Sequence, residues 1–451
     1  MSALPRGDVR RSHVLSIAWP VLVSMMSMTV MNLADAVFAG WAGTAELAAV
    51  GLASTLGFFL LTPARGLIRA VKILTSHAAG ADDRPRVRAW LAQGVWLSVV
   101  LGTGLGTLAW AGPWLFAVLG TSEAVSGHAS DYLWVMMLTA PVYTLVWTLE
   151  GWFQGQGDTR TPMRATLVAN GLNIVLDPWF IFGGAGLPAL GVGGAALATS
   201  VATVLQLVLL VVQVRQPLHR LAAWPRRDRL SEVIRFGMPL SVQWTLDFGG
   251  FMVLIALLAR AGDAQLAAHV LVFRLVMMSM LPGFSVADAA GVLVGQAIGA
   301  GRPEAASQAW RVSIQLAAGL MGAFGVAFLA VPELLIWPFQ PAADVAMVAV
   351  PLLGLAALWQ LADGVLMCNL QSLMAAGDTR FTMFAAVGAS WTIQVPISTL
   401  LVLHLEWGAF GGWVGITAEV LALTVVSTLR VMNTGWADHS TAVPSEVPVE
   451  A

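Results

Sequence analysis

The chain has 451 residues, of which 58% are hydrophobic and only 11% are charged. Its mean hydropathy of +0.78 excludes an ordinary water-soluble protein, because a globular fold cannot hide that much apolar surface from water. The net charge is −2 and no basic run is present, so a nucleic-acid partner is not expected. The single cysteine, Cys368, excludes an intrachain disulfide framework and a thiolate metal cluster.

The first thirteen residues are polar and basic, and an apolar run extends from Val14 to about Phe38. This run is too long for the core of a signal peptide, so we interpret it as the first membrane helix. Eleven more stretches are long enough to cross a bilayer, and no period-two alternation indicates a β-barrel. The twelve predicted spans are 14–38, 47–77, 90–112, 129–154, 163–183, 191–214, 233–260, 265–298, 307–330, 345–375, 382–404 and 409–431.

The positive charges lie mainly at one side of these predicted helices. If the N-terminus is cytoplasmic, 18 of the 23 Lys and Arg residues lie near cytoplasmic helix ends, whereas Arg260 lies near an outer end. Because Lys and Arg are enriched on the cytoplasmic side, we expect a multi-pass protein of the inner (plasma) membrane with both termini in the cytoplasm.

The second half of the chain repeats the first. GDTR occurs at 157–160 and again at 377–380, and Pro20 pairs with Pro239 at an offset of 219 residues. A repeat of six helices predicts two lobes of equal orientation, related by a pseudo-two-fold axis along the membrane normal. The predicted parts are an N-terminal cytoplasmic segment (1–13), an N-lobe (14–214), a cytoplasmic linker (215–232), a C-lobe (233–432) and a disordered cytoplasmic tail (433–451).

Polar residues inside the predicted helices of the first half form one group of candidates, because an ionisable group at membrane depth is expensive and usually functional. Asp177 follows Asn173 by four residues and Asn170 by seven, so the three share one helical face. The full group is Asn32, Asp35, Asn170, Asn173, Asp177 and Thr199.

A second group lies in the other half. Asp247 follows Gln243 by four residues, and Asp363 follows Gln360 by three. Glu419 aligns with Thr199 across the repeat and is a weaker candidate. The neighbouring aromatic and thioether side chains, which are expected to line a substrate site, are Trp244, Trp359 and Met367.

A carboxyl group in an apolar environment keeps its proton, because burial disfavours the charged form. An organic cation or Na⁺ beside the same group would displace that proton. One carboxylate therefore makes the binding of two cations mutually exclusive, as antiport requires. The alternative is that these aspartates cap broken helices or join helices to one another.

A basic stripe of Arg65, Arg69 and Lys72 follows helical spacing in the second predicted span. The repeat aligns Arg69 with Asp288, so one hypothesis is that this ion pair closes a cytoplasmic gate. Two alternatives are that the stripe extends to the inner lipid headgroups and that it receives an anionic substrate.

The remaining motifs have structural interpretations. In the GDTR turns, glycine is typical of a helix end, and Asp or Thr caps the helix that follows. The histidines lack metal-ligand spacing, and no Walker sequence is present. We therefore expect no enzyme activity, no metal site and no cofactor other than a coupling ion.

Three blocks of sequence resemble the multidrug and toxic compound extrusion (MATE) family. They are QGQGDTRTP…NGLNIVLDP…LGVGGAALAT, NLADAVFAGWAGTAELAAVGL and LPGF…LVGQAIGAG, and the resemblance covers residues 14–432. It implies an all-α integral membrane fold of twelve helices in two six-helix lobes, V-shaped with a central cleft. It also implies export of organic cations driven by Na⁺ or H⁺.

The resemblance also assigns roles to residues. Asp35, Asn173, Asp177 and Thr199 match the cation and proton site in the first lobe of the DinF-like branch. Asp247 and Asp363 match the acidic positions in helices 7 and 10 of the NorM-like branch. Two departures are that the helix 7 position often holds Glu, and that the basic stripe lies where the family is usually uncharged.

The predicted function is a secondary active multidrug efflux antiporter that exchanges H⁺ or Na⁺ for organic, mostly cationic, drug-like substrates. H⁺ is favoured because no cluster in the sequence supplies the five or six oxygens that Na⁺ prefers. The alternatives are a lipid-linked precursor flippase and an exporter of an anionic metabolite, with a membrane enzyme the least favoured. The expected partners are small organic cations and membrane lipid, and the protein is expected to be a monomer.

Overall fold

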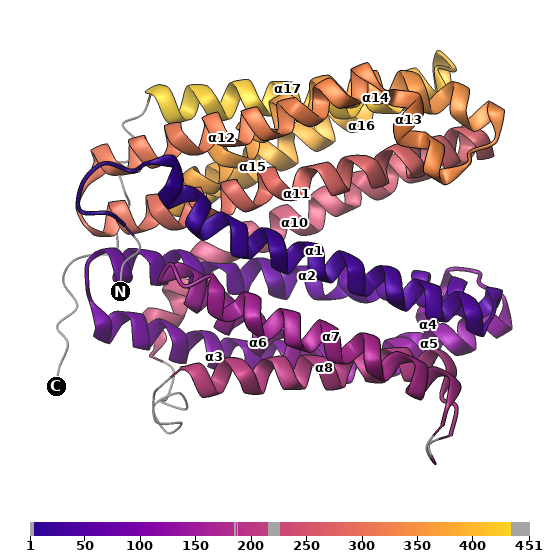
Figure 1. Ribbon diagram of the computed structural model, residues 1–451, viewed down its shortest axis with the longest axis horizontal. Helices are drawn as coiled ribbons and strands as arrows, with labels where there is room; N and C mark the ends of the chain where they lie inside the picture. The colour runs from indigo at the N-terminus through magenta and orange to yellow at the C-terminus, as the bar shows by residue number, and fades with distance from the viewer. Residues whose placement is uncertain (1–3, 185, 187, 215–225, 434–451) are drawn as a thin grey trace. The chain divides into compact units, whose positions relative to one another are not determined.

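The computed structural model describes residues 4–184, 186, 188–214 and 226–433, and it is built from helices joined by short loops (Figure 1). In the first half, α3 continues through the turn η1 into α4, and α5 and α6 form a pair bent by 50°. The helices of this half are α1 (Arg11–Ala42), α2 (Thr44–Gly80), α3 (Arg84–Gly106), η1 (Thr107–Ala111), α4 (Gly112–Val118), α5 (Glu123–Leu138), α6 (Ala140–Gly155), α7 (Arg160–Phe182) and α8 (Gly191–Gln213).

The second half follows a similar order. Its penultimate span is one continuous run in which two π-helical turns, η3 and η4, interrupt the α-helix. The helices are α10 (Arg227–Ala261), α11 (Asp263–Gly299), α12 (Pro303–Ala330), α13 (Pro332–Ile336), η2 (Trp337–Phe339), α14 (Ala343–Ala375), α15 (Thr379–Ala389), η3 (Ser390–Gln394), α16 (Val395–Thr399), η4 (Leu400–His404) and α17 (Gly408–Asn433).

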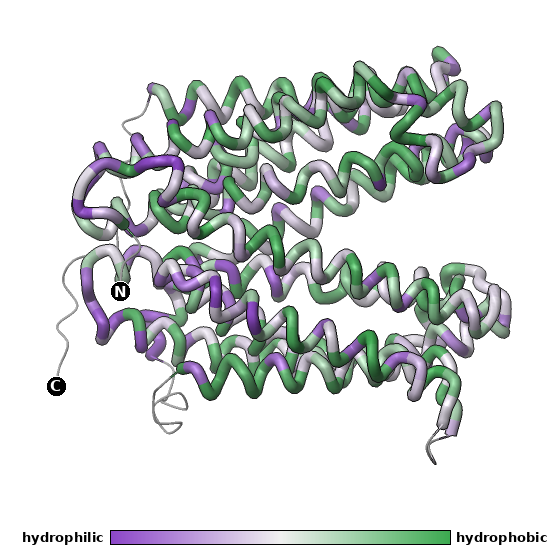
Figure 2. The backbone as a smooth tube through the Cα atoms, viewed as in Figure 1, coloured by the Kyte–Doolittle hydropathy of each residue, from purple (hydrophilic) through white to green (hydrophobic). Residues whose placement is uncertain are grey.

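Eleven helices in the described residues are long and apolar enough to cross a membrane, and the bent pair α5–α6 makes twelve spans. The predicted twelve-helix membrane fold is therefore confirmed. Figure 2 shows hydrophobic residues along most of each helix and hydrophilic ones in the segment before α1 and the loop between α2 and α3. Several helices extend past the predicted ends, because a helix can continue into the interface, where charged residues such as Arg84 are tolerated.

The repeat is visible in the helices themselves. Helices α2 and α11 each have 37 residues, and both their first and last residues are separated by 219 positions. Gly157 and Gly377, which open the two GDTR turns, both have positive φ (83° and 90°), a conformation that favours glycine. Asp158 accepts a hydrogen bond from the Thr161 backbone at 3.0 Å, as expected of a capping residue.

The chain forms two compact units. The unit called the N-unit here consists of Pro20–Thr75 and Asp83–Ser241, and the C-unit consists of Met1–Trp19, Ser76–Asp82 and Val242–Ala451. The predicted lobe boundaries at 14–214 and 233–432 stay a prediction.

The remaining predicted segments overlap the described residues only in part. The N-terminal segment packs within the C-unit, where the Leu4 and Val9 backbones donate to the side chains of Gln296 and Gln308. Within the predicted linker, α10 already begins at Arg227, and residues 215–225 lie outside the described residues. The predicted tail from residue 434 onward also lies outside the described residues.

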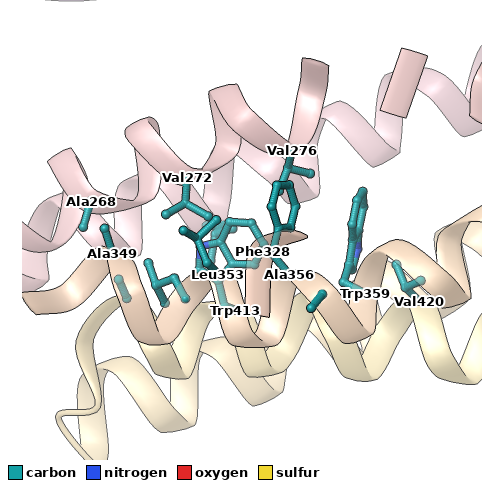
Figure 3. Close-up of a cluster of buried hydrophobic side chains, with 14 of the residues drawn as sticks. Ala268, Val272, Val276, Phe328, Ala349, Leu353, Ala356, Trp359, Trp413 and Val420 are labelled. Carbon is teal, nitrogen blue, oxygen red and sulfur yellow. The ribbon is translucent and has the colours of Figure 1, made fainter. Parts of the chain in front are cut away.

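Each unit has its own apolar core. In the C-unit, side chains of α11, α14 and α17 meet around Trp359 and Trp413, with Phe328 of α12 packed among them (Figure 3). In the N-unit, Phe116 and Leu133 are fully buried within a cluster that includes residues of α2 and α8. Such packing holds membrane helices together, because lipid removes the hydrophobic advantage of association.

A close approach of α6 to α2 positions one polar region of the N-unit. A Cβ atom at Gly155 would lie 2.7 Å from the Lys72 carbonyl oxygen and 2.9 Å from Thr75 Cβ. Only glycine permits this distance, as is common where membrane helices touch. The same helix, α6, carries Glu150, which lies within electrostatic reach of Arg65 and Lys72 of α2.

Candidate functional site

The strongest candidate site is a pair of carboxyl groups in the N-unit. Asp35 of α1 is 8% exposed and Asp177 of α7 is fully buried. Their carboxyl groups lie within hydrogen-bonding reach of each other. Two carboxyl groups can form such a bond only when one of them carries a proton. The sequence predicted both residues but could not show that they meet.

Asn173 connects this pair to α8. In the amide orientation that pairs both of its side-chain atoms, the nitrogen donates to Asp35 Oδ1 at 3.0 Å and the oxygen accepts from Thr199 Oγ1 at 3.2 Å. The amide also lies 3.4 Å from Asp177 Oδ1. Asp177 Oδ2 has no hydrogen-bond partner among the described residues. The structure thus brings together all four residues predicted as the coupling site of the first half.

The other two candidates of this half behave differently. Asn170 is 7% exposed, and its side-chain nitrogen donates to Ser27 Oγ of α1 at 2.9 Å. It therefore continues the polar face of α7 by one more turn. Asn32, in contrast, is exposed on α1 and does not share the enclosed position of Asp35.

The C-unit holds a second group of carboxyl groups. Asp363 is 6% exposed, Asp247 is half-buried, and the Gln243 side chain is hydrogen-bonded to Asp247. Glu419 of α17 lies close enough to both aspartates to interact electrostatically with them. Negative charges on these carboxyl groups would repel one another.

Several polar atoms near these carboxyl groups lack partners among the described residues. Gln360 is fully buried; its nitrogen donates to Ser279 Oγ and its oxygen is unpaired. The buried Trp359 indole nitrogen is also unpaired, while Trp244 and Met367 are half-buried. The unpaired oxygens are Asp247 Oδ1, Asp363 Oδ2, Gln243 Oε1 and Gln360 Oε1. Unpaired buried oxygens are costly and would be satisfied by a bound cation or by water.

The predicted gate residues lie in different units. Arg69 is half-buried in α2 of the N-unit, and Asp288 is 5% exposed in α11 of the C-unit. Their ion pair stays a prediction.

The structure adds one residue that the sequence reasoning missed. Glu150 of α6 is half-buried, accepts hydrogen bonds from Gln206 Nε2 at 2.9 Å and Thr166 Oγ1 at 3.4 Å, and lies within electrostatic reach of Arg65 and Lys72. It stands inside the predicted span 129–154. The rule that selected the aspartates, an ionisable residue within an apolar helix, therefore applies to it as well.

Arg65 lies in an aromatic environment. Its Cζ atom is 5.4 Å from the centre of the Trp147 ring and 5.8 Å from the Phe58 ring. Aromatic faces stabilise a guanidinium group at such distances. Arg65 is therefore stabilised by both rings and by Glu150 within the N-unit.

Comparisons with known proteins identify the family of the chain. The MatE family model matches residues 20–179 and 239–400, once on each half of the repeat and over more than half of the chain. The probable multidrug resistance protein NorM of Pseudomonas aeruginosa is 30% identical over 93% of this chain and 89% of its own length. The multidrug resistance protein NorM of Burkholderia vietnamiensis is 28% identical, with 92% of each chain covered.

Solved structures show the same fold. A MATE protein in a bent conformation superposes with a TM-score of 0.88 at 23% identity, covering 97% of this chain and 98% of its own. A transporter of the MOP superfamily from Pyrococcus furiosus, described as having a binding pocket of reverse polarity, has a TM-score of 0.86 at 22% identity and covers 94% and 95%. The duplicated family match and the NorM relatives lead to one conclusion: the chain belongs to the MATE family of membrane transporters.

Proposed function

We propose that this transporter is a secondary active multidrug efflux antiporter that exchanges H⁺ for organic, mostly cationic, drug-like substrates. The observation that carries the proposal is the Asp35–Asp177 carboxyl pair, buried in the N-unit and linked through Asn173 to Thr199. The names of the NorM relatives, which are multidrug resistance proteins, support the substrate class.

The physics of the pair favours exchange of a proton for a cation. Two ionised carboxylates about 4 Å apart repel by about 4 kcal/mol even at an effective dielectric constant of about 20. A shared proton removes this repulsion, and so does a nearby positive charge. A cation that binds beside the pair therefore releases the proton, and a proton that returns releases the cation.

The C-unit carboxyl groups form the proposed binding site for the organic cation within that unit. Asp247, Asp363 and Glu419 provide the negative charge that suits an organic cation. Na⁺ is the alternative coupling ion. The unpaired oxygens in the C-unit are the feature that supports it, because Na⁺ would be held by such oxygens.

A second candidate function is the export of an anionic substrate or the flipping of a lipid-linked precursor. Arg65, held between Phe58 and Trp147, favours it, since guanidinium groups bind phosphate and carboxylate well. The reverse polarity described for the P. furiosus transporter offers a parallel. The carboxylate Glu150 beside Arg65 weighs against it, because it offsets the positive charge.

The proposed location is the inner membrane, with both termini in the cytoplasm. The test of the function uses purified protein in liposomes, with a pH gradient or a Na⁺ gradient imposed separately. Ethidium transport should follow the pH gradient, persist without Na⁺ and stop with a protonophore. Strict dependence of transport on the Na⁺ gradient would identify Na⁺, and not H⁺, as the coupling ion. Transport that responds to neither gradient would contradict the proposal.

A further inference from the structure

Helix α7 carries a buried polar face along most of its length. Asp177, Asn173, Asn170 and Thr166 are spaced by four, three and four residues and therefore lie on one side of the helix. All four side chains are at most 7% exposed. At a rise of about 1.5 Å per residue, the face extends about 16 Å from the carboxyl pair toward the other end of the unit.

Helix α8 contributes a matching polar row. Thr199 contacts Asn173 at one end, and Thr203 donates to the Thr199 backbone oxygen at 2.7 Å. The Tyr143 hydroxyl of α6 lies within hydrogen-bonding reach of Thr203. At the far end, Gln206 Nε2 lies 3.0 Å from Thr166 Oγ1. The two helices thus enclose hydroxyl and amide groups that can carry hydrogen bonds along their shared boundary.

Glu150 terminates this row. Gln206 donates to both Glu150 and Thr166, so the carboxylate is bonded directly to the end of the polar face. It lies five residues from the end of α6 at Gly155. Among the described residues, Arg65 and Lys72 of α2 lie within its electrostatic reach, and the side chains of α7 and α8 that bond to it, Thr166 and Gln206, are neutral.

We propose that Glu150 is a relay residue that exchanges protons between the Asp35–Asp177 pair and the side of the membrane on which α7 begins and α8 ends. In the predicted orientation this side is the cytoplasm. The inference rests on the proposed H⁺ antiport. It adds a route by which the coupling proton leaves the N-unit without crossing the substrate site.

The route works by proton transfer between neighbouring groups. A proton released from the aspartate pair passes along the hydroxyl groups of Thr199, Thr203 and Tyr143 and then of Thr166, which contacts Glu150, and water bridges the steps that exceed direct hydrogen-bonding distance. Glu150 accepts it as a carboxylate and then loses it to the aqueous side. Once Glu150 has lost the proton, Arg65 and Lys72 offset the negative charge of its carboxylate. Coupling is preserved when the water-bridged steps open and close with the transport cycle.

The test compares two assays of the full-length protein in liposomes. Ethidium uptake driven by a pH gradient requires net proton movement, whereas exchange of labelled for unlabelled ethidium at equal pH does not. Glu150→Gln lacks a positioned proton-transfer group, so its rate of pH-driven ethidium uptake should be at least about tenfold lower than that of the wild type. Its exchange rate should stay within about twofold of the wild type, since the variant keeps the shape of the side chain.

Three further variants separate this role from a structural one. Glu123→Gln alters an exposed glutamate of α5 by the same chemistry and should match the wild type in both assays. Thr166→Val removes one hydroxyl of the row at constant shape and should slow only driven uptake. The double variant Arg65→Gln/Glu150→Gln restores charge balance and should remain slow in driven uptake.

Each result bears on the proposal. Normal driven uptake in both Glu150→Gln and Thr166→Val would overturn it, and so would recovery of driven uptake in the double variant, which would assign Glu150 to neutralising Arg65. If Glu150→Gln does not fold, normal driven uptake in Thr166→Val alone overturns the proposal. A wild-type protein that ignores the pH gradient would instead refute H⁺ antiport itself.

Discussion

The carboxyl groups of the two units are arranged in opposite ways. In the N-unit, Asp35 and Asp177 are joined to each other and to Asn173, and the buried Asp177 Oδ2 has no hydrogen-bond partner among the described residues. In the C-unit, Asp247 and Asp363 each carry a buried oxygen that is unpaired within the part of the chain that the structure describes, with Glu419 nearby. A repeated fold therefore holds two different chemical environments. The first suits storage of a proton, and the second suits a positively charged guest.

The largest effect is expected at the N-unit pair. Asp35→Asn keeps the shape of the side chain but removes its ability to take up or release the coupling proton. The variant also loses a charged hydrogen bond of Asp35. Such bonds contribute about 1.5–3 kcal/mol, so proton-driven ethidium transport should fall by about 100-fold. The measurement is the initial uptake rate in liposomes under a pH gradient. If uptake by Asp35→Asn stayed within threefold of the wild type, the N-unit pair would no longer be distinguished from the C-unit carboxyl groups as the holder of the coupling proton.

A smaller effect, of a different kind, is expected at Asp363. Asp363→Asn removes one negative charge from the C-unit and should weaken ethidium binding about tenfold, the equivalent of about 1.4 kcal/mol. Proton release by the N-unit pair should remain when ethidium saturates the variant. Binding is measured by fluorescence titration of the purified protein. An unchanged affinity together with lost proton release would reverse the assignment of the two units.

Glu419→Gln should have a weaker effect than Asp363→Asn. Glu419 is half-buried and acts on the aspartates through space, so its loss should change ethidium affinity by about threefold, as expected for a partly screened charge. The same titration measures it, and raising the salt concentration should reduce the difference. An effect larger than that of Asp363→Asn would make Glu419 the primary contact.

The smallest effect is expected at Asn32. Its side chain is exposed, whereas Asp35, one turn away, is buried. Asn32→Ala should change transport by no more than about twofold, as is usual for exposed positions. The liposome assay used for Asp35→Asn measures it. A large loss would show that the exposed face of α1 takes part in substrate binding.

Much of the fold could be predicted from the sequence because lipid imposes simple rules. Apolar length predicted the twelve spans, and the repeat of Pro20 and Pro239 predicted equivalent positions inside α1 and α10. The π-helical turns η3 and η4 were not predicted, although Pro396, two residues after η3, signals a local disturbance because it cannot donate a backbone hydrogen bond.

The candidate site was predictable only in part. Residue type and helical spacing identified the polar face of α7, but the contact between Asp177 and Asp35 joins residues 142 positions apart and depends on helix packing. Glu150 was overlooked because its partners Thr166 and Gln206 come from two other helices. Spacing within one helix does not reveal such a group, although its charge inside an apolar span was visible.

The most direct test of the central claim measures protons released when ethidium binds to the purified protein in weakly buffered solution. The wild-type protein should release protons on binding, and the double variant Asp35→Asn/Asp177→Asn should bind ethidium and release none. Equal release from the double variant, or binding to the wild type without release, would contradict the assignment of the coupling proton to the N-unit pair.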